Sequence, residues 1–118
     1  MRHVVLLALL ALPPATSYAG SGDSREQLRF GVNVARKGLW REARFRFERA
    51  ALLDPANASA LNNLAVALEQ QGDFAQARAA YDKALALKPN DTYIQQNYDL
   101  FREADDKRNR KAKKSSKP

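Results

Sequence analysis

GVNVARKGLWREARFRFERAALLDP, at residues 31–55, is followed at residues 65–89 by AVALEQQGDFAQARAAYDKALALKP, a second version of the same pattern. The two stretches begin 34 residues apart, and a fixed period of this length is typical of a repeat protein. Repeat proteins usually present a binding surface, so the period predicts binding rather than chemistry. Seven pairs are identical: Val32/Val66, Gly38/Gly72, Ala43/Ala77, Arg44/Arg78, Ala50/Ala84, Leu53/Leu87 and Pro55/Pro89.

Each version of the pattern predicts two helices joined by a tight turn. Gly38 and Gly72 lie between two apolar-periodic segments, and glycine adopts turn conformations at little steric cost. Pro55 and Pro89 close each unit, because proline cannot continue the preceding helix. The expected helices are 24–37, 40–53, 58–71, 74–87 and, after the second unit, 91–106.

Short polar residues stand where several of these helices begin. Asn57 and the pair Asn90-Asp91 precede the third and fifth helices, and Asp23 or Ser24 precedes the first. Side-chain oxygens of these residues accept hydrogen bonds from the free N–H groups of a first helical turn. We therefore expect an N-cap at each of these three places.

The period and its residue types resemble the tetratricopeptide repeat (TPR), which pairs two antiparallel helices in 34 residues. Three small helix-contact residues, an aromatic residue and a closing proline occur in each unit. They are Gly31, Ala43, Phe47, Ala50 and Pro55 in unit 24–57, and Ala65, Ala77, Tyr81, Ala84 and Pro89 in unit 58–91. The usual early tryptophan is replaced by Gln27 and Leu61. The resemblance implies an all-α fold, a TPR-type helix-turn-helix solenoid of two repeats.

A C-terminal capping helix is expected at 92–106. Ile94, Tyr98 and Phe101 are spaced to share one helical face. No partner helix with the repeat pattern follows, and the end of a solenoid needs a cover for its apolar face. We expect the three side chains to pack on the second repeat.

The N-terminus has the pattern of a cleavable signal peptide at 1–19, followed by a linker at 20–23. A positive start precedes an unbroken apolar run at 4–12, which is too short to span a bilayer as a helix. Small residues allow cleavage near Ala19, so we expect a periplasmic or secreted protein. The alternatives are a start codon placed too far upstream and an uncleaved apolar leader.

The residue inventory argues against an enzyme. The chain has no cysteine, and its one histidine, His3, lies in the predicted signal peptide. Thiolate chemistry, histidine acid–base catalysis and most zinc sites are thereby excluded from the mature chain. No glycine-rich phosphate loop or distinctive carboxylate pair is present. We expect no catalytic residue, no cofactor and no metal site.

A basic tail at 107–118 follows the capping helix, in a chain of formal net charge +7. The tail has no acidic residue and only Ala112 as an apolar one, so we expect it to be disordered. Its cations predict binding to anionic lipid or a cell-wall polymer, the alternative being a solubilising tail. Nucleic acid is disfavoured, because no aromatic residue interleaves the charges. The cations are Lys107, Arg108, Arg110, Lys111, Lys113, Lys114 and Lys117.

The resemblance implies that the first helix of each repeat, the A helix, lines a concave groove where peptides dock. The groove residues would be Arg25, Leu28, Arg29, Val32 and Arg36, then Ser59, Asn62, Asn63, Val66 and Gln70, with Tyr93, Gln96 and Leu100 added by the capping helix. Arginine suits carboxylates and asparagine pairs with a peptide backbone, so we expect an extended peptide with acidic and small apolar residues. The alternative is a solvated arginine face without a ligand.

Two functional hypotheses fit these features. The first is an exported, non-enzymatic adaptor of the cell envelope that binds a protein partner through the A-helix groove. The second is a repeat spacer that its basic tail tethers to an anionic envelope surface. Trp40 is expected in the core. Phe45 is interpreted either as a contact for a partner or a second copy, which would make a homo-oligomer, or as packing under the N-terminal segment.

Overall fold

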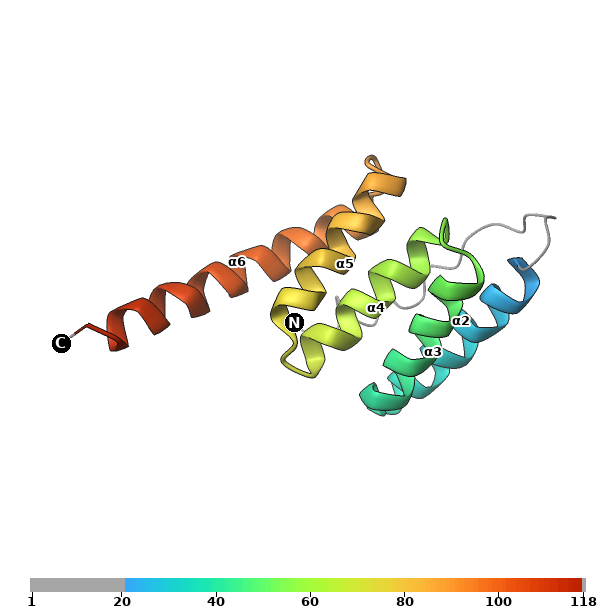
Figure 1. The fold of residues 1–118 in the computed structure, drawn as a ribbon, viewed down its shortest axis with the longest axis horizontal. Helices are drawn as coiled ribbons and strands as arrows, with labels where there is room; N and C mark the ends of the chain where they lie inside the picture. The colour runs from blue at the N-terminus through green and yellow to red at the C-terminus, as the bar shows by residue number, and fades with distance from the viewer. Residues whose placement is uncertain (1–20, 118) are drawn as a thin grey trace.

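The computed structural model describes residues 21–117, and these residues fold into helices without a strand. The helices are α2 (Ser21–Arg36), α3 (Trp40–Leu53), α4 (Ala58–Gln70), α5 (Phe74–Leu87) and α6 (Thr92–Ser115). Figure 1 shows two hairpins, α2 with α3 and α4 with α5, followed by α6, which lies against α5 and extends beyond it. The predicted all-α helix-turn-helix solenoid is confirmed.

The structure tests only part of the predictions made for the N-terminus, because it describes the chain from residue 21 onward. The signal peptide predicted at 1–19 and its cleavage near Ala19 lie outside the described residues and stay predictions. The linker predicted at 20–23 is wrong where the structure describes it, because α2 already begins at Ser21. Within residues 21–117, no helix combines the length and apolar character that crossing a bilayer requires.

The two predicted turn glycines are confirmed by their backbone angles. Gly38 has φ of 77° and Gly72 has φ of 83°, in the left-handed region that glycine adopts most readily. In the first turn Leu39 N–H donates to the Val34 carbonyl at 3.1 Å while Gly38 N–H donates to the Ala35 carbonyl at 2.9 Å. This pair of hydrogen bonds is the Schellman motif, which satisfies the last carbonyls of a helix and reverses the chain.

Two of the three predicted N-caps form. The side chain of Asn57 accepts from Ala60 N–H, and that of Asp91 accepts from Ile94 N–H, both at 3.1 Å. Ser24 is no cap, because α2 begins before it. Its buried hydroxyl instead donates to the Ala50 carbonyl at 2.7 Å and accepts from Asn57 Nδ2 at 3.0 Å. Ser24 thus joins α2 to the end of α3 and the start of α4.

Small residues let the paired helices approach closely, as the repeat pattern predicts. Ala43, Ala50, Ala77 and Ala84 are all fully buried. Gly31 is buried against Phe47, and a methyl group added at this glycine would overlap the phenylalanine ring. Close packing therefore requires these residue types. Half-buried Trp40 packs against the same core, as expected.

The first half of α6 covers the second repeat as predicted. Ile94, Tyr98 and Phe101 are all buried. The rings of Tyr98 and Phe101 each lie with their centres 5.4 Å from that of Tyr81 on α5. Aromatic pairs at this separation add to the energy of burial itself. The aromatic cluster therefore fixes α6 on α5.

The second half of α6 contradicts the sequence prediction. We expected a capping helix ending at 106 and a disordered tail at 107–118, but one helix continues to Ser115. Lysine, arginine and alanine are good helix formers, so a helix that has already begun continues through them at little cost. Lys113 and Lys114 in the last turn also interact favourably with the helix dipole. Low apolar content alone was therefore a poor reason to predict disorder.

An ionic cluster around Asp105 anchors the start of this extension. The nearly buried Asp105 carboxylate accepts hydrogen bonds from Arg78 at 2.7 Å and from Arg108 at 3.2 Å. The hydrogen bond from Arg78, with help from Arg108, holds the pKa of Asp105 below its usual value of 3.8. The Arg108 guanidinium also lies 3.5 Å from the centre of the Phe74 ring, a cation–π contact.

Arg44 and Arg78, which occupy the same position in the two repeats, make equivalent ion pairs. Arg44 of the first repeat donates to Asp73 at 2.6 Å, across to the second repeat. Arg78 of the second repeat donates to Asp105 of α6. Each arginine therefore ties its own unit to the next one along the chain, which gives a physical reason for its recurrence.

Candidate protein-binding surfaces

Half of the predicted A-helix groove is not available to a ligand. Leu28, Val32 and Val66 belong to the buried core, and Asn62 and Asn63 are buried as well. The prediction that these five side chains face an open groove is wrong. The physical reason is that neighbouring helices cover these faces: α2 packs on α3 and α4, and α4 packs on α5, α3, α2 and α6.

The buried asparagines connect helices. Asn97 Nδ2 on α6 donates to Asn62 Oδ1 on α4 at 3.3 Å, and Asn62 Nδ2 donates to Asn63 Oδ1 at 3.1 Å. A buried amide that loses its partner costs about 1–3 kcal/mol, so these bonds favour one register of α6 on α4. Asn62 and Asn97 therefore join α4 to α6, whereas Asn63 bonds to its neighbour on α4 and its own Nδ2 has no hydrogen-bond partner among the described residues.

The other five groove residues predicted on α2 and α4 remain accessible in different degrees, and Tyr93, Gln96 and Leu100 of α6 are exposed. Arg29, Arg36 and Gln70 are exposed, whereas Arg25 and Ser59 are half-buried. The three arginines share one face of α2 by their spacing and form a basic row on that helix. Ligand binding by this row stays a prediction.

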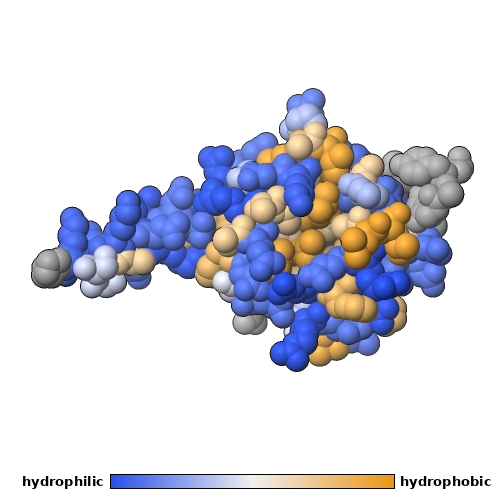
Figure 2. All heavy atoms as spheres, viewed as in Figure 1, coloured by the Kyte–Doolittle hydropathy of each residue, from blue (hydrophilic) through white to orange (hydrophobic). Residues whose placement is uncertain are grey.

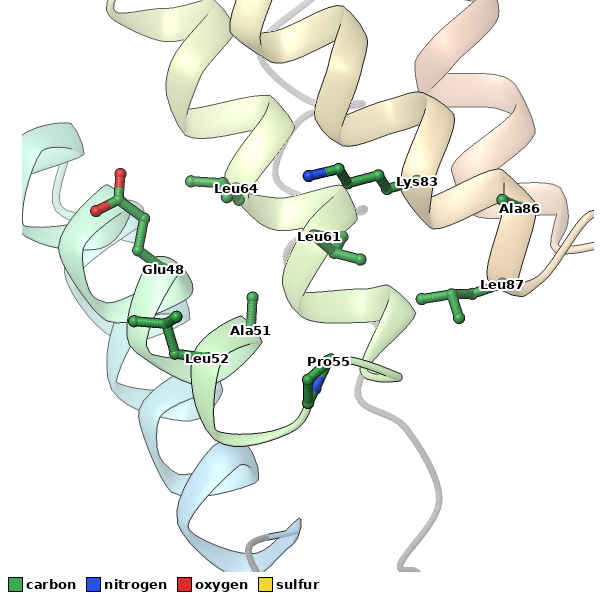
Figure 3. Close-up of a pocket in the computed structure, with 9 residues that line it drawn as sticks. All are labelled: Glu48, Ala51, Leu52, Pro55, Leu61, Leu64, Lys83, Ala86 and Leu87. Carbon is green, nitrogen blue, oxygen red and sulfur yellow. The ribbon is translucent and has the colours of Figure 1, made fainter.

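The sequence did not predict a second surface, the B-helix groove, between the second helices of the two repeats. Within residues 21–117, the backbones of α3 and α5 do not approach each other, although Arg44 on α3 donates to Gln76 on α5 at 3.4 Å, and α4 forms the floor of a groove between them. Its volume is about 690 Å³, within the range of ligand pockets. Figure 3 shows its lining side chains: Glu48, Ala51, Leu52, Pro55, Leu61, Leu64, Lys83, Ala86 and Leu87.

The B-helix groove is apolar and open. Leu61 and Leu64 form its half-buried floor, while Leu52 on one wall is 79% exposed and Leu87 on the other is 42% exposed. Figure 2 shows apolar side chains gathered on the face of the repeats and a hydrophilic surface along the extension of α6. Adjoining exposed apolar side chains of this kind are typical of interaction sites.

The two charged side chains of the groove lie on opposite walls. Glu48 accepts from Arg44 Nε at 2.9 Å and so already has a cationic partner, which it shares with Asp73. Lys83 makes no ion pair with any residue between 21 and 117. A partner would therefore meet an apolar surface with one available cation at its edge.

A signal for this groove was present in the sequence. Helix α3 carries its core residues Ala43, Phe47 and Ala50 on one face. A second apolar pair, Ala51 and Leu52, lies beside that face on the same helix, and Pro55 follows just after the helix ends. One buried face does not need two apolar sets, so the second set indicates another contact surface.

The outer face of the first repeat is covered by arginine. Arg46 stands where the second repeat has the buried Ala80, and its guanidinium lies 4.0 Å from the centre of the Phe30 ring. Arg46 Nε also donates to Glu42 at 3.0 Å. Arg46 Nη1 also donates to Gln27 on α2 at 3.3 Å, so this arginine covers the aromatic face of the hairpin. The nearby Phe45 is half-exposed, and its predicted contact stays untested.

Comparison with known families agrees with this architecture. Residues 28–92 match the family described as tetratricopeptide repeat. The match covers more than half of the chain, so the protein belongs to the tetratricopeptide repeat family. Members of this family generally mediate protein–protein interactions and are typically non-enzymatic scaffolds. A search of curated proteins gives no match.

Proposed function

We propose that this TPR protein is a non-enzymatic adaptor that binds an apolar helical segment of a partner protein in the B-helix groove. The observation that carries the proposal is the set of adjoining leucines, above all Leu52 at 79% exposure, around an open groove of about 690 Å³. Leaving such a surface exposed forgoes burial energy, which a bound apolar segment would recover.

The lining favours a helix as the occupant over an extended peptide. Its polar side chains are Glu48, already bonded to Arg44, and Lys83. An extended backbone would bury N–H and C=O groups that these side chains cannot satisfy, at a cost for each group. A helix satisfies its own backbone and needs only an apolar face. An acidic residue beside that face would pair with Lys83.

The proposal includes export to the periplasm or the outside of the cell. Its support is the signal-peptide pattern at 1–19. The adaptor would then connect proteins of the cell envelope. Fractionation of cells tests this part separately: we expect the protein outside the cytoplasm with a new N-terminus near Ala19, and a cytoplasmic protein that begins at Met1 would contradict it.

Peptide selection against the full chain tests the groove. A library of displayed peptides should yield sequences with apolar residues at helical spacing and a nearby acid. Leu52→Glu should weaken their binding by at least about tenfold, because truncating a central contact commonly costs about 2 kcal/mol or more. Leu39→Glu is the matched control, since Leu39 is an exposed leucine at the opposite end of α3. Selected peptides that bind the Leu52→Glu chain unchanged would refute the proposal.

A further inference from the structure

The extension of α6 is a basic helix that leaves the body of the protein. Figure 1 shows it continuing past α5, and Figure 2 shows its hydrophilic surface. From residue 107 to residue 117 every residue is exposed except the half-buried Arg108. Because the extension is helical, its cations have fixed directions, which a disordered tail would not give them.

One face of α6 carries a row with a seven-residue spacing. Tyr93, Leu100, Lys107 and Lys114 follow one another at this interval, so they lie along one side of the helix. Lys111, four residues after Lys107, widens the basic half of the row. Tyr93 is 52% exposed and Leu100 is 40% exposed. We call these five residues the outer row.

The outer row points away from the side of α6 that packs on the repeats. The packed side is defined by buried or anchored residues, namely Ile94, Asn97, Tyr98, Phe101, Asp105 and Arg108. At 100° per residue, Lys107 lies well over 90° around the helix from the average direction of that set. A flat surface could therefore contact the outer row without displacing α6 from the body.

We propose that the outer row lies on an anionic lipid surface, with Lys107, Lys111 and Lys114 among the headgroups and Leu100 and Tyr93 at the interface. A one-sided row suits a plane, and tyrosine and leucine next to lysines suit the boundary between headgroups and acyl chains. The site is separate from the B-helix groove, so the adaptor would be held at a membrane while its groove stays open.

Two acidic residues near the outer row affect its attraction to an anionic surface. Glu103 precedes the basic half on the same side of the helix, and Asp106 lies 3.6 Å from Arg78. Beyond Asp106 there is no further acid, so the terminal turns are purely basic. A single-stranded nucleic acid is less suitable as the partner, because the basic turns present no aromatic ring on which bases could stack.

Vesicle binding by the full chain tests the proposal with a matched pair of variants. The probes are vesicles of phosphatidylglycerol with phosphatidylcholine and vesicles of phosphatidylcholine alone. Binding through the apolar run at 4–12 would be common to both vesicle types, so the difference in affinity between them measures the charge-dependent part. Each headgroup-facing lysine should add roughly fivefold in affinity at low salt. Lys107→Gln with Lys111→Gln should therefore weaken the anionic preference by about 25-fold.

The control removes the same charge from outside the row. Lys113→Gln with Lys117→Gln should cost less than about threefold; glutamine has nearly the helix propensity of lysine at the positions within α6, and Lys117 lies after the helix ends. Raising the salt concentration should weaken binding of the parent chain. Equal losses in the two pairs would overturn the fixed row. Equal binding of the parent to both vesicle types, or binding of a single-stranded oligonucleotide in place of vesicles, would overturn the lipid surface.

Discussion

Replacing Phe101 with alanine is the most direct perturbation of the fold. Phe101 has no exposed surface, and its ring lies 5.4 Å from that of Tyr81 and 6.4 Å from that of Tyr98. The change removes the centre of the aromatic cluster that fixes α6 on the second repeat. Two repeats are fewer than the three usually needed for a stable solenoid, so α6 should be essential for folding.

The expected magnitude follows from this burial. Phenylalanine-to-alanine changes in cores cost about 3–5 kcal/mol. A domain of this size has a free energy of unfolding of about 5–15 kcal/mol, so Phe101→Ala should remove a large part of it. At about 4–8 °C per kcal/mol, the melting temperature should fall by at least about 12 °C. Leu100→Ala, at the neighbouring exposed position, should cost less than about 1 kcal/mol.

Urea unfolding followed by two signals measures this prediction. Far-ultraviolet circular dichroism reports all helices, whereas fluorescence of Trp40, the single tryptophan, reports the first repeat at the other end of the protein. If the units fold together, Phe101→Ala lowers both midpoints equally. A loss below about 1 kcal/mol, or a Trp40 transition that does not move, would refute the reasoning that α6 stabilises the whole solenoid.

Two further substitutions test the packing and the ionic cluster. Gly31→Ala should lower the free energy of unfolding by about 1–3 kcal/mol despite alanine's better helix propensity, because its methyl group would overlap Phe47; a stabilised variant in urea unfolding would contradict this. The lowered pKa of Asp105 means that its contribution is complete above its unfolded-state pKa and is lost as the pH falls through its folded-state pKa. Asp105→Asn should therefore lower the free energy of unfolding by about 1–3 kcal/mol at pH 7. It should also reduce the difference in urea midpoint between pH 7 and pH 3. An unchanged difference would contradict this, because other carboxylates would then dominate the pH dependence.

The repeat itself could be predicted from local chemistry. Gly38 and Gly72 adopt the expected positive φ, and Asn57 and Asp91 cap the expected helices. A glycine turn and a side-chain cap depend on a few adjacent residues, which the sequence shows directly. Helix boundaries within the repeats accordingly agree to within a few residues.

Features that depend on contacts between residues far apart in the chain could not be predicted from the sequence. A valine such as Val66 is suited both to a binding groove and to a core. It is buried here because neighbouring helices cover it, which the sequence does not show. Arg108 looked like one more tail cation until its contact with Phe74, 34 residues earlier, showed it to be an anchor. The B-helix groove likewise arises from the separation of α3 and α5, which no single helix encodes.

In-cell photo-crosslinking tests the central claim, that the B-helix groove is the site where a partner protein binds. A photoreactive residue is placed at Leu52 in the groove, at Arg29 in the basic row of α2, or at Leu39 as the control, each in the full chain. We expect one dominant protein adduct from position 52, through an apolar helical segment of the partner, and little from positions 29 and 39. A dominant adduct from position 29 with none from position 52 would contradict it.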